Sequence, residues 1–173
     1  MTGAAAHGFF SLAPFALLMA FGWVAVWEWD RRMCAAAAVF LFAGLVSNLG
    51  LKHTARALRL RSAVLHRPSS CPLAASGTSE QCSIIPSWRA GPLVGSSRLG
   101  FPSGHSQSLW MLAVLWLLHR GWASPQHRLV STWLIWAYAG SVSHQRVVVG
   151  CHSLLQVVVG AAVGVVIAVA LSG

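Results

Sequence analysis

Residues 154–171 read LLQVVVGAAVGVVIAVAL, an apolar run interrupted by a single polar residue, Gln156. The hydrocarbon core of a bilayer takes about 20 apolar residues of helix, so a run of this length predicts a membrane span. Gly, Ala and Val dominate the run, and small residues let neighbouring helices approach closely within a membrane. This stretch therefore predicts a helix that crosses a membrane and packs tightly against another helix.

Four more apolar runs precede this one. We expect membrane helices at residues 9–27, 33–51, 106–122 and 129–143. Residues 53–101 are rich in Arg, Ser, Pro and Gly, and we expect them to form a long polar loop. The predicted fold is all-α: a polytopic membrane helical bundle with about five transmembrane helices, in which residues 1–173 form a single domain.

The composition of the chain supports this interpretation. The 173 residues are 56% hydrophobic and 9% charged, whereas soluble domains carry about 25% charged residues. The net charge of +9 arises because twelve Lys and Arg residues face only three acids, Glu28, Asp30 and Glu80. A basic excess fits nucleic acid, anionic lipid or a phosphate-bearing substrate. No nucleic-acid-binding module is recognisable, so we expect the bilayer and a lipid phosphate to be the partners, and no nucleic acid.

Five alternating spans would bring three separated segments to one membrane surface. Residues 52–105, the stretch around Arg146 and the stretch around His152 fall on one side, and the short turns fall on the other. This arrangement predicts a composite site. Cys71 and Cys82 lie in the first of these segments at a spacing that is not typical of zinc sites, and they can pair if the loop faces an oxidising lumen.

The first candidate motif is Pro102-Ser103-Gly104-His105, directly before an apolar run. Ser103 suits a helix N-cap, and the free N–H groups of a helix start bind phosphate well. Gly104 would let the phosphate approach the backbone, and His105 would stand beside it as a proton donor. The alternative is an ordinary capped helix start with an interfacial histidine.

The second candidate motif runs from Arg146 through His152 to Gln156. Residues four apart share one helix face, so the Gln156 oxygen can accept the Nδ1–H of His152 and leave Nε2 bare for attack on phosphorus. Arg146 offers a planar fork of donors for phosphate oxygens. The alternative is a juxtamembrane arginine and histidine that reach for lipid head groups.

A third segment, from Lys52 to Arg59, follows the span at 33–51. Seven residues are close to two helical turns, so both side chains would point the same way and could grip one phosphate. The alternative is a basic flank that anchors a helix to anionic lipid.

Together the three segments resemble the lipid phosphatase and haloperoxidase superfamily, the type 2 phosphatidic acid phosphatases. The family pattern is Lys-x6-Arg-Pro, then Pro-Ser-Gly-His, then Ser-Arg-x5-His-x3-Asp. Three positions depart from it. Leu60 replaces the first proline, although Arg67-Pro68 lies eight residues further on and leaves Arg67 as an alternative to Arg59. Gln145 replaces the serine, and Gln156 replaces the aspartate that orients the nucleophile.

The resemblance implies a role for each matched residue. The residues expected to hold the phosphate are Lys52, Arg59, Ser103, Gly104 and Arg146. His152 would form a phosphohistidine, with Gln156 orienting its ring, while His105 would protonate the leaving oxygen and then activate water. The resemblance implies no metal and no other cofactor.

The chain is most similar to the dolichyl-diphosphatase branch of the superfamily. The likeness rests on His105-Ser106-Gln107, on Gln156-Val157, and on Asn48 with Leu51-Lys52. It implies hydrolysis of dolichyl diphosphate to dolichyl phosphate, with the active site facing the lumen of the endoplasmic reticulum, in support of N-glycosylation. Two alternatives remain: a phosphatidate or undecaprenyl-diphosphate phosphatase, and a catalytically inactive lipid-binding or scaffold protein.

Overall fold

The computed structural model describes residues 31–60, 62–68, 99–118 and 125–172. Their helices are α3 (Arg31–Ala57), α4 (Ser62–Leu65), α7 (Gly104–Leu118), α8 (Pro125–Val148) and α9 (Leu154–Ser172). An isolated bridge joins His66 to Leu99, and these ranges contain no strand. The prediction of an all-α fold is therefore confirmed for the described residues. The expected span at 9–27 and the pair Cys71 and Cys82 lie outside them.

Each of the other expected spans coincides with a helix. Residues 33–51 lie in α3, 106–118 in α7, 129–143 in α8 and 154–171 in α9. The stretch expected to be a polar loop includes the last turns of α3 and all of α4. Among the described helices, only α9 meets the length and composition needed to cross a membrane, so the count of about five transmembrane helices stays a prediction. At about 1.5 Å per residue, its 19 residues extend about 28 Å, close to the thickness of the hydrocarbon core.

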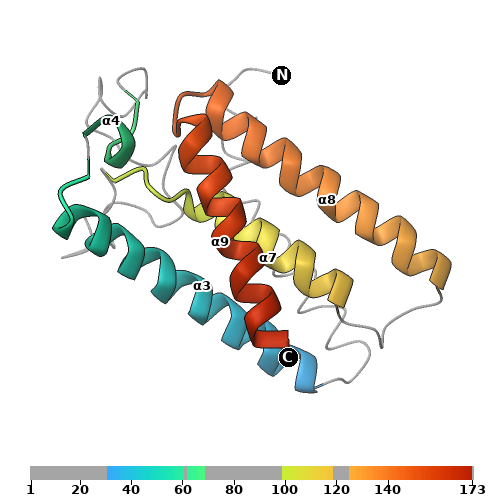
Figure 1. Cartoon of the computed structure of the whole chain (residues 1–173). Helices are drawn as coiled ribbons and strands as arrows, with labels where there is room; N and C mark the ends of the chain where they lie inside the picture. The colour runs from blue at the N-terminus through green and yellow to red at the C-terminus, as the bar shows by residue number, and fades with distance from the viewer. Residues whose placement is uncertain (1–30, 61, 69–98, 119–124, 173) are drawn as a thin grey trace, which may run out of the picture.

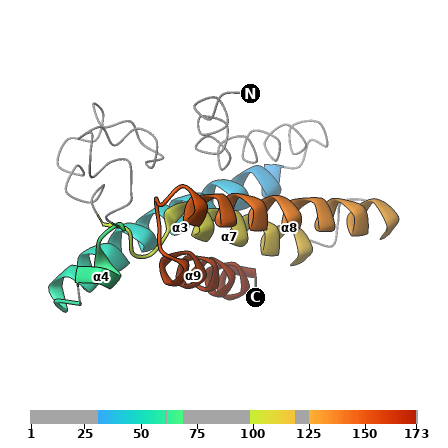
Figure 2. The same cartoon turned by 90° about the horizontal axis from the view of Figure 1, so that it is seen from above.

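Helix α7 lies at the centre of the bundle, where α3, α8 and α9 all pack against it (Figures 1 and 2). Its buried residues occur on all of its faces, as expected for an apolar helix that is enclosed by others. Two apolar clusters result. The cluster toward α8 comprises Leu109, Ala113, Ala139 and Val142, and the cluster toward α9 comprises Met111, Val114, Leu115 and Ala168.

The glycines of α9 lie directly against the backbone of α7. A Cβ added at Gly160 would lie 2.5 Å from the carbonyl oxygen of Ser103, and one added at Gly164 would collide with the carbonyl oxygen of Gln107. Ala168 continues the four-residue spacing and is fully buried. Small residues at this spacing let two helix backbones pack directly against each other. The small-residue run in the sequence thus has α7 as its partner.

A buried polar network joins α3 to α7. The Asn48 amide donates to the Gln107 side-chain oxygen at 2.8 Å and to the Pro102 carbonyl at 3.3 Å. The Gln107 amide in turn donates to the Gly44 carbonyl at 2.9 Å and to the Ser47 hydroxyl at 2.7 Å. Buried polar groups cost free energy unless they are paired, so this network fixes how α3 and α7 are aligned.

Large apolar side chains cover the outside of the described helices. Phe42 of α3 is 71% exposed, Trp133 of α8 is 67% exposed and Val166 of α9 is 66% exposed. Soluble monomers rarely show such extensive apolar surface, whereas helices in contact with lipid require it. The surface therefore agrees with a bundle that sits in a membrane.

The contact between α9 and α7 can be tested with Gly164→Ala. The added methyl group forces the two backbones apart, and overpacking of this kind costs about 1–3 kcal/mol. We expect a lower Tm in detergent than for the wild type. Gly140→Ala in α8 is the matched control, because a Cβ there meets no atom within 4 Å. The control should keep or slightly raise the Tm, since alanine favours helix over glycine. An unchanged Tm for Gly164→Ala would contradict the proposed role of this contact.

Candidate active site

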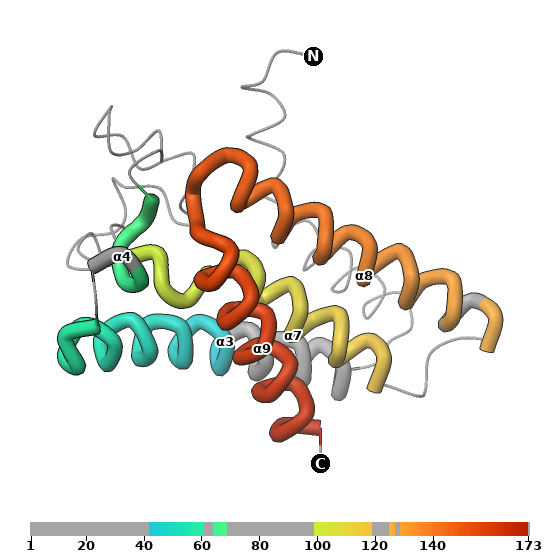
Figure 3. Tube along the Cα trace, turned by 45° about the horizontal axis from the view of Figure 1, so that its top comes forward, coloured from blue at the N-terminus to red at the C-terminus, as the bar shows by residue number. Residues whose placement is uncertain are grey.

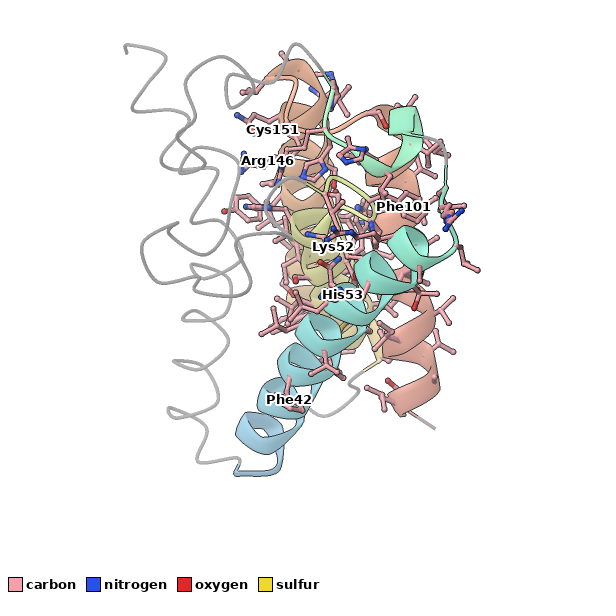
Figure 4. All side chains as sticks on the ribbon, turned by 90° about the vertical axis from the view of Figure 1, so that its left-hand side faces the viewer. Phe42, Lys52, His53, Phe101, Arg146 and Cys151 are labelled. Atoms are coloured by element: carbon pink, nitrogen blue, oxygen red, sulfur yellow. The ribbon has the colours of Figure 1, made fainter. Side chains whose placement is uncertain are left out.

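Four segments of the chain meet at one end of the bundle. They are the C-terminal part of α3, the α4 segment (residues 62–68, which include α4), the entry to α7 and the connection from α8 to α9. Figure 3 shows α4 beside the chain that enters α7, and two backbone hydrogen bonds, from Gly100 and Phe101 to the Leu65 carbonyl, join them. Figure 4 shows Lys52, Phe101, Arg146 and Cys151 at this end, with Phe42 toward the other end of α3.

The His152 ring is oriented at both of its nitrogens. Nδ1 lies 2.9 Å from the Gly100 carbonyl oxygen, and Nε2 lies 3.2 Å from Nη1 of Arg67. A carbonyl only accepts and a guanidinium only donates, so Nδ1 carries the proton and Nε2 carries the lone pair. This tautomer follows from the two partners. It presents Nε2 as a nucleophile, facing a cation.

Burial and nearby positive charge keep the His152 ring neutral. Burial lowers the pKa of this ring well below 6.5, and the charges of Arg67, Lys52 and Arg146 lower it further, whereas the hydrogen bond to Gly100 raises it. The depressed pKa means that the contribution of His152 to stability is complete above about pH 6.5. That contribution is lost as the pH falls toward the folded-state value. At neutral pH Nε2 therefore keeps its lone pair, which faces Nη1 of Arg67.

The arginine beside His152 is Arg67, and not Arg59 as the motif spacing favoured. Arg67 also donates to the Cys151 carbonyl at 2.9 Å, so its guanidinium bridges two neighbouring residues of the α8–α9 connection. Arg59 is exposed and lies beyond the end of α3, with a φ of 51°. The expectation assumed that the helix continues past Lys52 for two turns. It ends at Ala57 instead, so the helical spacing no longer relates these two side chains.

Lys52 is the first residue after the apolar segment 33–51. Burial, with a smaller contribution from the positive charge of Arg67, lowers the pKa of Lys52 to about 8. Its charge also acts on His152, which places it within electrostatic reach of the nucleophile. Lys52 is thus still cationic at neutral pH, but it loses its proton more readily than an exposed lysine does.

Arg146 and His105 form a second pair at the same end of the bundle. Arg146 is 0% exposed, and its Nη2 lies 3.1 Å from Nε2 of His105, which is also buried. The sequence predicted both residues but not their direct contact. Nη1 of Arg146 lies 3.8 Å from the sulfur of Cys151, which is disulfide-bonded. The side chains of the other three cysteines lie outside the described part of the chain.

Ser103 caps α7, as the sequence predicted. Its hydroxyl oxygen lies 3.5 Å from the Ser106 N–H, and its carbonyl accepts the Gln107 N–H at 3.0 Å. The side chain is fully buried and also contacts the Ser106 hydroxyl. Gly104 begins the helix, and a Cβ there would lie 3.3 Å from the Asn48 side-chain oxygen. The N-terminus of α7 therefore lies at the site end of the bundle, directly before His105.

Gln156 does not orient the His152 ring as the sequence suggested. That expectation placed both residues on one helix, but α9 begins at Leu154 and His152 lies before it. The Gln156 oxygen accepts the Ser153 N–H at 3.0 Å, and its amide nitrogen donates to the carbonyls of Val64 and His66. The Gly100 carbonyl holds the ring in its place.

The assembled groups can bind an anion and attack it. The described residues contain no Asp or Glu and no group of three or more potential metal ligands. Lys52, Arg67 and Arg146 all act on one neutral histidine, so an incoming phosphate would meet cationic donors around the nucleophile.

The sequence did not point to Gly100 and indicated Arg67 only as the alternative to Arg59. Gly100 contributes a backbone carbonyl, for which no sequence pattern exists. Arg67 carried a usable signal, since Arg67-Pro68 keeps the arginine–proline pair of the family motif while Arg59-Leu60 does not.

The PAP2 superfamily model matches residues 32–172, which include every described residue of the site. No curated protein and no solved structure matches the chain.

The electrostatic role of Arg67 predicts a change in the pKa of His152. Arg67→Gln removes a positive charge beside the ring, so we expect the pKa to rise toward its ordinary value. Arg59→Gln, the matched control at an exposed position, should leave it unchanged. An NMR titration of labelled histidines in detergent measures this pKa, with the His152 signal identified by its loss in His152→Gln. Equal shifts in the two arginine variants would contradict the assignment of Arg67.

Proposed function

The chain belongs to the PAP2 superfamily, whose members are phosphatases, and we propose on this basis that it is a membrane phosphatase that removes phosphate from a lipid carrier. The observation that carries the proposal is the neutral, ring-oriented His152, whose Nε2 faces Arg67 at 3.2 Å. A buried, neutral imidazole whose unprotonated nitrogen faces cations suits nucleophilic attack on a phosphate.

In the proposed first step, the Nε2 lone pair of His152 attacks phosphorus. A nitrogen–phosphorus bond forms while the bond from phosphorus to the leaving oxygen breaks. His105 acts in its protonated form: Arg146 turns from Nε2 of His105 to the bound phosphate, Nε2 takes a proton from solvent, and it gives this proton to the leaving oxygen. The product is a phosphohistidine plus the released lipid phosphate or lipid alcohol. Arg67, Lys52 and Arg146 stabilise the charge on the transferring group through ionic hydrogen bonds.

In the second step, His105 takes a proton from water, whose oxygen attacks phosphorus of the phosphohistidine. The nitrogen–phosphorus bond breaks, inorganic phosphate leaves, and His152 regains its neutral form. The N–H groups at the start of α7, including that of Gly104, are suited to hold the phosphate oxygens in both steps, because they add the partial positive charge of a helix N-terminus. The proposed cycle uses no metal and no cofactor.

As substrate we propose dolichyl diphosphate, cleaved to dolichyl phosphate and phosphate. The proposal rests on the resemblance to the dolichyl-diphosphatase branch. Among the residues that carry this resemblance, Asn48 contacts Gln107, and Gln156 contacts the α4 segment. For the active site we propose the lumenal face of the endoplasmic reticulum. The disulfide at Cys151, next to the nucleophile, supports an oxidising compartment on that side.

Phosphate release by purified protein tests the proposed activity. We expect the wild type in detergent with excess chelator to release phosphate from dolichyl diphosphate faster than from phosphatidate. His152→Ala should lose at least about 10²–10⁴-fold in rate, the usual contribution of a catalytic histidine, while remaining folded by Tm. Preference for phosphatidate or undecaprenyl diphosphate would keep the chemistry and change the pathway. No release of phosphate by a folded wild type would instead support a lipid-binding or scaffold protein.

The lowered pKa of Lys52 predicts an alkaline limit to activity. Lys52 is charged below about pH 8 and neutral above it, so kcat/KM of the free enzyme should fall as the pH rises through this value. Lys52→Arg retains a cation that does not titrate in this range, and it should move the alkaline limb of the profile to higher pH. A limb that stays in place in Lys52→Arg would assign it to another group.

A further inference from the structure

Gln156 joins the α8–α9 connection, which carries His152, to the start of α9 through a reciprocal capping arrangement. Its backbone N–H donates to the Ser153 hydroxyl at 3.3 Å, and its side-chain oxygen accepts the Ser153 N–H at 3.0 Å. Such a pair satisfies two donors at a helix start and fixes the direction from which the chain enters. Since His152 immediately precedes Ser153, this cap sets where the nucleophile stands.

The amide nitrogen of the same side chain holds the α4 segment. It donates to the Val64 carbonyl at 2.8 Å and to the His66 carbonyl at 2.7 Å. These carbonyls lie three residues and one residue before Arg67, whose guanidinium faces His152. Both amide hydrogens are therefore used to hold the backbone that carries this arginine.

Gly100 packs against the other side of the Gln156 amide. A Cβ added there would lie 2.5 Å from the Gln156 side-chain oxygen, so any larger residue would push the amide from its hydrogen bonds. Gly100 also donates its N–H to the Leu65 carbonyl at 2.9 Å and accepts the Nδ1–H of His152. Gly100 and Arg67 both orient the His152 ring. Gly100 packs against the Gln156 amide, and the backbone that precedes Arg67 is hydrogen-bonded to the same amide.

We infer that Gln156 is a positioning residue that acts through Arg67, by tying the α4 segment to the loop of the nucleophile. The inference rests on the proposed function for its catalytic meaning. The side chain is fully buried. Its oxygen accepts a hydrogen bond in the cap of α9, and its two N–H groups donate to the α4 segment. Its side chain makes no hydrogen bond to His152.

An amide is required because the position needs one acceptor and two donors. A carboxylate only accepts, so Glu at this position would keep the cap but would face the Val64 and His66 carbonyls without a hydrogen to share. Buried carbonyl groups without a hydrogen-bond donor cost free energy, so the α4 segment would move away from residue 156. The glutamine therefore suits this chain, and an acid here would displace Arg67.

A double-mutant cycle between Gln156→Glu and Arg67→Ala tests the inference. We expect Gln156→Glu alone to lower kcat/KM about 10–100-fold, as for a residue that orients an active group. Arg67→Ala alone should lower it about 10²–10³-fold. If Gln156 acts through Arg67, the double variant is no slower than Arg67→Ala, within a factor of about three. Losses that multiply would overturn the inference and leave the proposed function intact.

The pH dependence of Gln156→Glu supplies a readout that simple destabilisation does not. Protonation of the introduced carboxyl group at low pH restores one donor toward the α4 carbonyls. The ratio of its activity to that of the wild type should therefore rise as the pH falls. A ratio that is flat or falls toward low pH would contradict the proposed loss of donors.

Gln107→Glu is the matched control, because Gln107 is also a buried amide with both donors and its acceptor in use, between α3 and α7. Its effect on kcat/KM should multiply with that of Arg67→Ala. Ser153→Ala removes the hydroxyl of the cap while leaving the Gln156 donors in place, and it should retain more activity than Gln156→Glu. The reverse order would locate the function of Gln156 in the cap.

Hydrogen exchange gives a second test that needs no activity. Gln156→Glu should speed exchange of the Gly100 and Phe101 amides, which donate to Leu65, whereas Gln107→Glu should leave them protected. Unchanged protection in Gln156→Glu would overturn the inference. If Gln156→Glu speeds exchange but the wild type has no phosphatase activity, the positioning role of Gln156 is upheld and the proposed function fails.

Discussion

The close approach of α9 to α7 is the constraint on which the rest of the structure depends. Gly160 lies against the backbone of Ser103, and Gly164 lies against that of Gln107, so the start of α9 stands beside the start of α7. The Ser103 N–H donates to the Gln156 carbonyl at 3.0 Å and completes this junction. Because His152 precedes α9 and His105 follows Ser103, one helix contact brings both histidines to the same end of the bundle.

The site concentrates positive charge in a place where water is scarce. Burial, with a smaller contribution from the charge of Arg67, lowers the pKa of Lys52 to about 8, which means that the folded protein bears an electrostatic cost for this charge at neutral pH. A bound phosphate would relieve this repulsion, because it places negative charge among the cations. The same cations that would bind the phosphate also disfavour charge on His152 and so keep it nucleophilic.

The segment between Lys52 and Arg67 shows how a motif can tolerate a changed spacing. Helix α3 ends at Ala57, α4 follows, and the chain returns so that Arg67 reaches the nucleophile from another direction. Gln156 holds the returning chain by its carbonyls. Phosphate recognition needs a guanidinium at the right point in space, and any backbone path that delivers it serves.

The sequence by itself determined the long apolar helices α3, α7, α8 and α9, although not α4, since apolar runs such as 154–171 need no distant partner to indicate their type. It also identified His152, His105, Arg146 and Lys52, because their residue types are tied to local motifs. Tertiary structure alone decided the rest. Which arginine faces His152, and which oxygen holds its ring, depend on where α3 ends and on a backbone carbonyl at Gly100. Every residue has such a carbonyl, so only the packing of separate segments shows which one is used.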